Sequence, residues 1–522
     1  MSMWVAQRIQ PQRQLLVWTG LGLLTAFIVQ QVRQWYRLRH IPGPRLAGWS
    51  ILWQLSGALS GRYHEILNEV AEEYGALVRI GPNELLSTDP EVIRRISGVR
   101  SRYQKGRFYD SGKVTPGVDT VVSMRDEEKH KAMRAKMWAG YAGRASEGSS
   151  FEPGMDRQVL NFMDLLERKY ISTAESTVPF DLAQKTQFFA LDAIGDISMG
   201  TPFGYLSKDE DLFDYNEINR TSLPVMNVVS VLPWLTDIVH KWPFRLALPK
   251  DGDNIGFGRL MTFVLAILSR LTFLPLTFDS IATQLVDARL DPQSDPMQDM
   301  LQAHINSGMS REELIQQVFI FIIAGANSSS QALRMILLAL FTNPTAYNSL
   351  IAEIQEASTV VSSPISWSET QSLPYLKAVV LEGFRMWPPV GGLGFKTVPP
   401  EGDTIAGYFI PGGTNVGQGF HGVGRSKAVW GQDANVFRPE RWLISDQEEL
   451  RDMQAAVDTH FGAGKYSCLG KPIALMELHK AVFELLRRYD LGLIDPEKPI
   501  KVESSIFHMA SDFWVKLTKR GN

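Results

Sequence analysis

Apolar residues recur every three to four positions through most of the chain between Tyr63 and Pro388, which is the periodicity of amphipathic helices. Segments with strand-like character are short. We expect Leu77–Ser87 to form a hairpin, Thr404–Pro411 to be β-like, and Ile506–Leu517 to form a final hairpin. Because apolar strands do not alternate with the helices, the pattern predicts a mainly α fold with small peripheral sheets.

One predicted helix is much longer than the others. Ser310-Arg-Glu-Glu313 has the pattern of a capping box, and apolar residues then continue as far as Asn343-Pro344. About 33 helical residues would span roughly 50 Å, most of the width of a domain of this size. In contrast, we expect the apolar stretch Leu223–Trp242 to be loop-like.

The middle of the long helix reads Ala324-Gly325-Ala326-Asn327-Ser328. Small side chains such as Ala324 and Gly325 leave room for a flat ligand, and hydroxyls within a helix can bond to carbonyls and open it locally. A polar bend or a close helix crossing would use the same residues. The segment taken alone therefore leaves these interpretations open.

The N-terminal segment differs from the rest, because Leu15–Val29 is uncharged and mainly apolar. A helix from Gln14 to Val32 would be roughly 28 Å long, about the thickness of the hydrocarbon core. The larger number of basic residues after this helix predicts that the rest of the chain is cytosolic. A cleaved signal peptide is the alternative, but we find no convincing cleavage site. We expect residues 1–40 to form a membrane anchor and residues 41–522 one large domain, joined by a stiff hinge at Ile41–Pro44.

The composition fits a large globular core, since 44% of the 522 residues are hydrophobic and 21% are charged. A net charge of −3 gives no indication of nucleic-acid binding. The chain has one cysteine, Cys468, which excludes an intramolecular disulfide and sites built from several cysteines. Cys468 is therefore a buried apolar side chain, a nucleophile, or the single thiolate ligand of a large cofactor.

The surroundings of Cys468 favour a ligand role. The segment from Phe461 to Gly470 contains three glycines, which let a backbone approach a flat group closely. An amphipathic helix is expected to begin at Lys471, so Cys468 lies where free N–H groups and the helix dipole stabilise a thiolate. Taken alone, a buried cysteine before a helix has a purely structural role about as often as it has a functional one.

The spacing Phe-x-x-Gly-x-x-x-Cys-x-Gly resembles the heme-binding loop of cytochromes P450. The resemblance extends along nearly the whole chain: the long helix resembles the I helix, Glu382-Gly-Phe-Arg385 resembles the K helix, and Ile41–Pro44 resembles the proline-rich hinge of membrane-bound members. The Gly-Lys-Tyr-x-Cys-Leu-Gly-Lys loop is similar to that of fungal P450s of the pisatin-demethylase-like group. The resemblance implies the P450 fold, with residues 41–522 as a heme-thiolate catalytic domain.

The resemblance also implies a cofactor, heme b, whose iron is bound by Cys468. Family positions for heme contacts are occupied by Phe461, Gly464, Lys465, Gly470, Ala324 and Gly325. The cations expected at the heme propionates are His130, Arg134 and Lys396. Tyr466 occupies the usual arginine position in the cysteine loop, where Lys465 would compensate. Each of these cations taken alone would also fit a solvated surface.

Two residues match the catalytic part of the family's long helix. In the pattern Ala-Gly-x-acid-Thr, Asn327 stands for the acid and Ser328 for the threonine. Ser328 can still hold a water molecule, whereas Asn327 cannot ionise or transfer a proton as a carboxylate does. This departure leaves the route of proton delivery open.

Two further groups are expected to play supporting roles. Glu382, Arg385 and Arg441 should form a buried network, in which removal of one partner typically costs about 3–5 kcal/mol. Four lysines would form a basic face for a flavoprotein reductase, or they are merely solvated charges on helix faces. They are Lys129, Lys131, Lys136 and Lys480.

The resemblance implies a monooxygenase that inserts one oxygen atom from O2 into a lipophilic small molecule. The chain is too short to include fused flavin domains, so NADPH-cytochrome P450 reductase would supply the electrons. We expect a single-pass protein of the endoplasmic reticulum membrane with a cytosolic catalytic domain. Its substrate would be a secondary metabolite such as a terpenoid or polyketide, because the expected substrate-facing segments are mostly apolar. These segments are Tyr103–Val121, Leu223–Trp234, Phe321–Ala326, Val390–Phe395 and Phe507–Asp512.

Two alternatives remain at this stage. The first is a heme enzyme that uses peroxide or catalyses a rearrangement and needs no reductase. It is suggested by Asn327, which stands where the family pattern has an acid. The second is a heme sensor without enzymatic activity.

Overall fold

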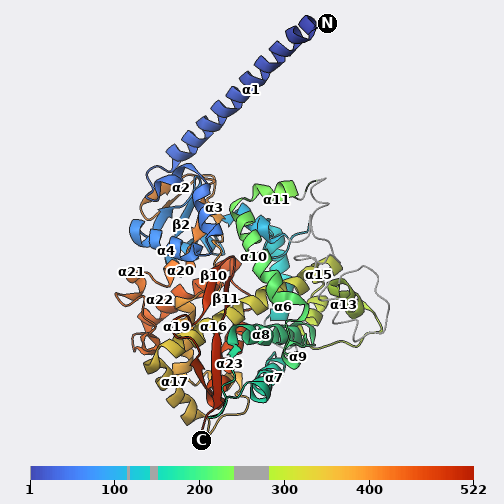
Figure 1. Cartoon of the computed structure of the whole chain (residues 1–522), viewed down its shortest axis with the longest axis vertical. Helices are drawn as coiled ribbons and strands as arrows, with labels where there is room; N and C mark the ends of the chain where they lie inside the picture. Colours follow the sequence, from blue (N-terminus) through green and yellow to red (C-terminus); the bar gives the residue numbers. More distant parts are fainter. Residues whose placement is uncertain (1, 114–117, 142–150, 240, 242–280, 522) are drawn as a thin grey trace.

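Helices form most of the body of the molecule, and α1 projects from it (Figure 1). The computed structural model describes residues 2–113, 118–141, 151–239, 241 and 281–521. Within these residues the helices are α1 (Ser2–Arg37), α2 (Arg45–Trp49), α3 (Leu52–Leu59), α4 (Tyr63–Tyr74), α5 (Pro90–Ser97), α6 (Glu127–Tyr141), α7 (Glu152–Lys169), α8 (Leu182–Met199), α9 (Tyr205–Lys208), α10 (Tyr215–Val231), α11 (Trp234–Val239), α13 (Ile281–Leu290), α14 (Met300–Asn306), α15 (Arg311–Ile320), α16 (Asn327–Thr342), α17 (Pro344–Ala357), α18 (Trp367–Thr370), α19 (Pro374–Met386), α20 (Phe420–Val423), α21 (Lys427–Trp430), α22 (Gln447–Asp458) and α23 (Lys471–Arg488).

The sheets are small, as the sequence predicts. The largest has the order β1-β2-β8-β5-β3 and includes the expected hairpin, with Leu77 opposite Ser87. The strands are β1 (Leu77–Arg79), β2 (Glu84–Ser87), β3 (Gln104–Lys105), β4 (Phe180–Asp181), β5 (Lys396–Thr397), β6 (Asp403–Ile405), β7 (Tyr408–Ile410), β8 (Asn415–Gln418), β9 (Tyr489–Leu493), β10 (Lys501–Ser504), β11 (His508–Ser511) and β12 (Trp514–Lys519).

The prediction of a final hairpin at Ile506–Leu517 is wrong. β11 pairs with β10, whereas β12 pairs with β9 and β4. The chain changes direction at Asp512, which has a φ of 58°, and Phe513 then enters the core with no exposed surface. Burial of that ring on one side of the turn separates the two strands into different sheets.

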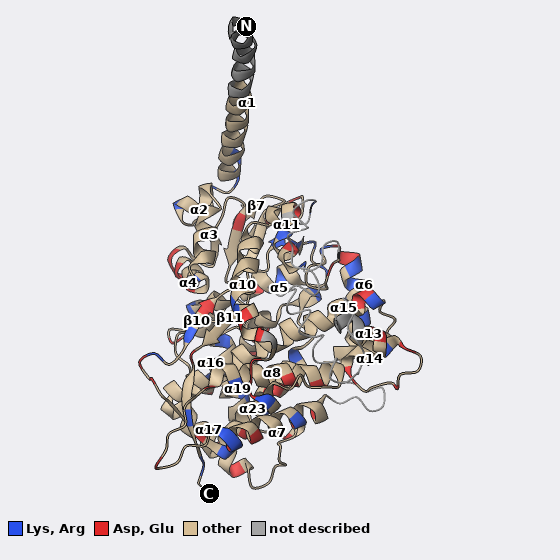
Figure 2. Cartoon of the chain, turned by 45° about the vertical axis from the view of Figure 1, so that its right-hand side comes forward, with Lys and Arg blue, Asp and Glu red and all other residues tan. Residues whose placement is uncertain are grey.

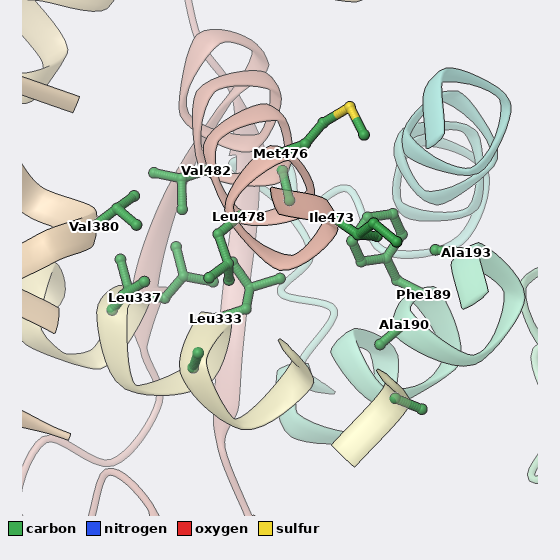
Figure 3. Packing of buried hydrophobic residues seen from close by; sticks show 14 of the residues in the cluster. Phe189, Ala190, Ala193, Leu333, Leu337, Val380, Ile473, Met476, Leu478 and Val482 are labelled. Atoms are coloured by element: carbon green, nitrogen blue, oxygen red, sulfur yellow. The ribbon is translucent and has the colours of Figure 1, made fainter. Parts of the chain in front are cut away.

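The core lies where α8, α16, α19 and α23 meet. Figure 3 shows Leu333 and Leu337 of α16 beside Leu478 and Val482 of α23, and Val380 of α19 lies next to them. These five side chains are all essentially inaccessible to solvent. Truncating one such leucine to alanine typically costs about 2–5 kcal/mol, so this packing fixes α16 and α23 relative to each other.

The long helix predicted after Ser310 is confirmed, and it contains a wider turn in its middle. Ser310 and Glu313 form the capping box. α15 then runs into a π-helical segment, Phe321–Ala326, that leads directly into α16. Such segments often occur at functional sites. The local opening of the helix expected from its small and hydroxyl residues is therefore present.

The prediction of a loop-like region at Leu223–Trp242 is wrong for its described part. α10 continues to Val231 although Pro224 lies inside it, and α11 follows; residues 240 and 242 lie outside the described residues. The helix persists because Tyr215, Ile218 and Leu223 are buried along it. Pro224 masked this pattern in the sequence, since proline normally ends a helix.

The residues that the structure describes include no single helix long and apolar enough to cross a membrane. Only the pair formed by Arg311–Thr342 and Pro344–Ala357, which is bent by 107°, reaches that length and apolarity together.

Candidate active site

The loop around Cys468 is closed by a backbone hydrogen bond. The Cys468 N–H donates to the carbonyl of Phe461 at 2.6 Å, and the Phe461 ring packs on Phe384 of α19 with 4.7 Å between centroids. Gly464 has a φ of 54°, and a Cβ there would lie 2.3 Å from the carbonyl oxygen of Ser97. Glycine at 464 is thus required by backbone conformation and by contact with α5.

The Cys468 side chain lies just before α23, whose N-cap is Gly470. The residue is accessible to solvent, yet the protein atoms around the sulfur desolvate it enough to raise the pKa of the thiol. The N–H groups of Gly470 and Lys471 and the charge of Arg134 oppose this rise, because they stabilise the thiolate. Cys468 therefore combines access for a ligand with donors directed at the sulfur.

Several cations gather beside this loop, and three of them belong to the predicted set. Arg134 donates to the carbonyl of Ser467 at 2.8 Å. Lys465 donates to the carbonyls of Ser101 and Tyr103 and pairs with Glu127 at 3.0 Å. The third predicted cation, Lys396, is only 1% exposed.

The aromatic residues of the cluster hold the amines in place. The Lys396 Nζ donates to the Tyr109 hydroxyl and lies 4.0 Å from the centre of the Tyr466 ring. Tyr466 itself bonds to Glu127. Sequence reasoning missed Lys105 and Tyr109. Lys105 is 5% exposed and donates to the carbonyls of Val121 and Val122.

The cluster contains more positive than negative charge among the described residues. Burial lowers the pKa of Lys105 to about 7 and that of Lys396 well below its usual value. Burial first, and then the surrounding cations, lower the pKa of His130 to about 3, so His130 is neutral. The charge of Glu127 opposes this lowering for both Lys105 and Lys396, and the charge of Asp119 opposes it for Lys105 as well. An additional pair of carboxylates would stabilise the lysines, so this donor set fits the two propionates of a heme.

Ala324 and Ser328 lie one turn apart on the long helix. The Ser328 hydroxyl donates to the Ala324 carbonyl at 2.7 Å, and both residues are partly exposed although most of their neighbours are buried. Gly325 has a different environment, because a Cβ there would lie 2.7 Å from the side chain of Ile194 in α8. For Gly325, the close helix crossing is therefore the interpretation that its contacts favour.

Asn327 is 7% exposed, and its amide is bonded to two neighbouring helices. Its oxygen accepts from Asn219 at 3.3 Å, from Tyr215 at 3.4 Å and from Gln187 at 3.4 Å. Its Nδ2 donates to the Asn219 oxygen at 3.3 Å. These contacts join Asn327 to α10 and α8, a role that the sequence did not predict.

The buried network predicted around Glu382 is confirmed. Glu382 and Arg385 have no exposed surface and pair at 2.8 Å, and the Arg441 Nε lies 3.0 Å from the same carboxylate. The Trp442 indole and the Arg438 backbone also donate to it. The carboxylate thus links α19 to the segment that precedes α22.

The prediction of a basic surface is wrong for Lys480. This residue has no exposed surface and pairs with Glu152 at 2.7 Å and Asp156 at 2.6 Å. It lies on the α23 face that packs against α7, so its charge is neutralised inside the fold. Lys129 and Lys131 on α6 are exposed as expected, and Lys136 pairs with Glu313 at 2.8 Å.

Comparison with known proteins gives consistent matches. The family described as "Cytochrome P450" matches residues 41–248 and 277–512. The chain is 37% identical over 509 residues to "Cytochrome P450 monooxygenase ABA1" of Pyricularia oryzae, with 95% of each chain covered. It is 36% identical over 488 residues to "Cytochrome P450 monooxygenase aba1" of Botryotinia fuckeliana, with 92% of each covered. It is 31% identical over 492 residues to "Cytochrome P450 monooxygenase cicH" of Emericella nidulans, with 93% of this chain and 94% of the relative covered.

Proposed function

The chain belongs to the cytochrome P450 family and is a monooxygenase of that family, and from this premise we propose that Cys468 binds the iron of its heme b. One observation carries the proposal: the sole cysteine of the chain is accessible to a ligand, and the N–H groups of Gly470 and Lys471 favour its thiolate. When bound, the heme supplies the activation of dioxygen, which a thiolate ligand favours.

The other residues of the site would hold the heme in place. Arg134, Lys396 and Lys465 provide charge for the propionates, and we add Lys105 to this set on the basis of its burial among them. His130 is neutral in this environment, so it would act as a hydrogen-bond partner. The loop residues Phe461, Gly464 and Gly470 would contact the heme from the segment around Cys468. Ala324 would contact it from the long helix, together with Gly325, which also allows the close approach of Ile194 in α8.

Ser328 is our candidate for handling protons. Its hydroxyl donates to the Ala324 carbonyl at 2.7 Å, so the oxygen can accept a hydrogen bond from a water molecule while its own hydrogen stays directed at the helix. Asn327 would act indirectly, because its amide holds α10 and α8 against the π-helical segment. In this scheme Ser328 positions water and Asn327 positions the helix.

We infer a lipophilic substrate from secondary metabolism. The apolar segments expected to face it include Phe321–Ala326 and Val390–Phe395; residues 114–117 of the segment Tyr103–Val121 lie outside the described residues. The loop resemblance to the pisatin-demethylase-like group supports the same class. NADPH-cytochrome P450 reductase would dock near the exposed Lys129 and Lys131.

We also propose that residues 1–40 anchor the protein in the endoplasmic reticulum membrane and leave residues 41–522 in the cytosol. α1 projects from the body (Figure 1), and its part from Trp18 to Val32 carries no charged residue (Figure 2). Between Trp18 and Val32 its large exposed apolar side chains are Trp18, Leu21, Leu23, Leu24, Phe27, Ile28, Val29 and Val32.

Spectroscopy and turnover test the proposal in two steps. The reduced carbon monoxide difference spectrum of the wild type should show a thiolate-type Soret band, and Cys468→Ser should abolish it. Bound heme without that band in the wild type would refute ligation by Cys468. Product formation that needs NADPH, reductase and O2, and is not supported by peroxide alone, would then separate reductase-driven turnover from the peroxide-dependent alternative.

A further inference from the structure

A buried arginine, Arg79 in β1, connects the C-terminal end of α1 to the body of the protein. Its guanidinium donates to the carbonyls of Trp35 at 3.1 Å and Gln34 at 3.2 Å, both in the last turn of α1. It also donates to the carbonyls of Gly48 in α2 at 3.1 Å and Pro82 in the β1–β2 turn at 2.7 Å. Because the last four carbonyls of a helix have no partners within it, Arg79 caps α1 and joins it to two parts of the body at once.

The charge of Arg79 is retained inside the fold. The residue is 3% exposed, and burial lowers its pKa only to about 10, against which the charge of Glu84 acts. Arg79 is therefore charged at neutral pH, and a cation is favoured at the C-terminus of a helix by the helix dipole. An apolar residue in its place would leave the carbonyls around it without this donor.

Packing around Arg79 fixes α1 in the same position. The rings of Trp35 in α1 and Trp49 in α2 are stacked with 5.1 Å between centroids. The Arg79 backbone N–H donates to the Pro42 carbonyl at 2.7 Å, and Leu38 is fully buried beside the largest sheet. The end of α1 and the chain that follows it are therefore held by the body on several sides.

Exposed apolar side chains gather on α2 and α3, next to the point where α1 leaves the body (Figure 1). On α2, Leu46 is 72% exposed and Trp49 is 44% exposed, and their spacing of three places them on one face. On α3, Leu52 and Leu59 are 65% and 67% exposed, again on one face because they are seven positions apart. Short helices with such faces are typical of a surface that lies on a membrane.

Cations surround the same end of α1. Arg33, Arg37, Arg39 and Arg45 are all exposed and lie between the last turns of α1 and the start of α2. Lipid phosphates attract such cations, and tryptophan is favoured at the level of the headgroups. This combination of apolar side chains with a ring of arginines favours a phospholipid surface over an apolar protein surface as the partner.

We propose that Arg79 locks α1 to the body, so that the apolar faces of α2 and α3 are held in the headgroup region of the bilayer. Arg79 is then a positioning residue that sets the orientation of the catalytic domain on the membrane. Contact with lipid rests on the proposed anchoring of α1, whereas the lock itself does not require a bilayer.

Distances between two spin labels test the lock on the full-length heme-loaded protein in dodecyl maltoside micelles. Labels at Gly20→Cys in α1 and Glu73→Cys in α4 should give one narrow distance distribution, and the parent chain with Cys468 alone measures the background. Arg79→Met should broaden the distribution, because the carbonyls lose their common donor. Trp35→Ser should also broaden it, without the removal of a buried charge.

Arg37→Met is the matched control for the distance measurement. Arg37 also reaches from α1 to the body, but it is exposed and bonds only to the Gly412 carbonyl, at 2.8 Å. Its distribution should stay as narrow as that of the wild type. A narrow distribution in Arg79→Met and Trp35→Ser, or equal broadening in Arg37→Met, would overturn the lock. An unchanged reduced carbon monoxide spectrum shows that each variant is folded.

Lipid contact is tested in phosphatidylcholine nanodiscs that contain a phosphatidylcholine with a diazirine near its headgroup. Mass spectrometry should find the label in residues 18–32 and 46–59. It should be absent from Val360, which is 82% exposed but follows α17 at the opposite end of the molecule (Figure 1). Arg79→Met should keep the label in residues 18–32 and lose most of it in residues 46–59.

The labelled positions separate this inference from the anchor on which it rests. Absence of label from residues 18–32 would remove the proposed anchor and the lipid contact with it. Label in residues 18–32 without label in residues 46–59 would leave the anchor standing and overturn the contact of α2 and α3 with lipid. Equal labelling of residues 46–59 in the wild type and Arg79→Met would show that Arg79 does not set the orientation.

Discussion

Asn219 and Asn327 exchange two amide hydrogen bonds of 3.3 Å between α10 and α16. Both residues are buried. Tyr215 and Gln187 also donate to the Asn327 oxygen, so three donors converge on a neutral acceptor. At the position where the family pattern has an acid, this chain has an amide that connects α16 to α10 and α8.

Replacement of Asn327 by aspartate tests whether a carboxylate at this position changes turnover. Asn327→Asp keeps the three donors but leaves the Asn219 oxygen without its partner and buries a charge. We expect the free energy of unfolding to fall by about 1–3 kcal/mol. The coupling of NADPH consumption to product should not rise, because the side chain contacts α8 and α10. A marked rise in coupling would show that the missing carboxylate limits proton delivery.

The amide pair itself is tested by a double-mutant cycle. Asn219→Ala and Asn327→Ala should each destabilise the protein, and the double variant should be destabilised by less than their sum. We expect an interaction energy of roughly 0.5–3 kcal/mol, the range for contacting residues. Urea unfolding of the four proteins measures it. Additive effects would mean that the two amides do not stabilise each other.

Local sequence signals predicted the parts of this fold that depend on neighbouring residues. The Ser310–Glu313 capping box and the Leu77–Ser87 hairpin are specified within a few positions. The Glu382 network was predictable because its spacing matches a family motif. α10 was missed because Pro224 is a strong local signal against a helix, whereas burial along the helix overrides it.

Residues whose roles depend on distant partners gave no such signal. Lys105 is a single lysine in a two-residue strand, and nothing nearby indicates that its amine would meet the carbonyls of Val121 and Val122. Lys480 lies on an amphipathic helix, and its pairing with Glu152 depends on how α23 packs against α7. Asn219 contacts Asn327 only because α10 lies beside α16 in the folded chain.

Lys105 should contribute to retention of the heme. Lys105→Met keeps most of the side-chain volume but removes a cation that would face the propionates. We expect heme to transfer to an excess of apomyoglobin roughly tenfold faster, in line with loss of one charge-assisted hydrogen bond. Lys113→Met is the control, because Lys113 is more exposed and pairs with Asp110 at 3.1 Å. Equal rates in the wild type and Lys105→Met would contradict a propionate contact.

Glu382 should be important for stability. Glu382→Gln leaves Arg385 and Arg441 buried without their carboxylate, and we expect a loss of about 3–5 kcal/mol. Asp433→Asn is the matched control, because Asp433 pairs with Arg441 at 3.3 Å but is 36% exposed; its effect should stay below about 1 kcal/mol. Similar losses in chemical unfolding of both variants would show that burial of the Glu382 network adds nothing.

The buried carboxyl of Glu477 should make the free energy of unfolding depend on pH. The residue lies on α23 and is 5% exposed. Burial raises the pKa of its carboxyl to about 8, and a hydrogen bond from Ser329 acts in the opposite direction. Because the folded protein holds this proton more tightly than the unfolded chain, the carboxyl should destabilise the fold progressively as the pH rises from about 4.5 to about 8. Glu477→Gln carries no such proton. The difference in unfolding free energy between Glu477→Gln and the wild type should therefore grow over this interval, by an amount on the order of 4–5 kcal/mol. Urea unfolding at several pH values measures this difference, and a constant difference would mean that burial does not shift the pKa of Glu477 away from its value in the unfolded chain.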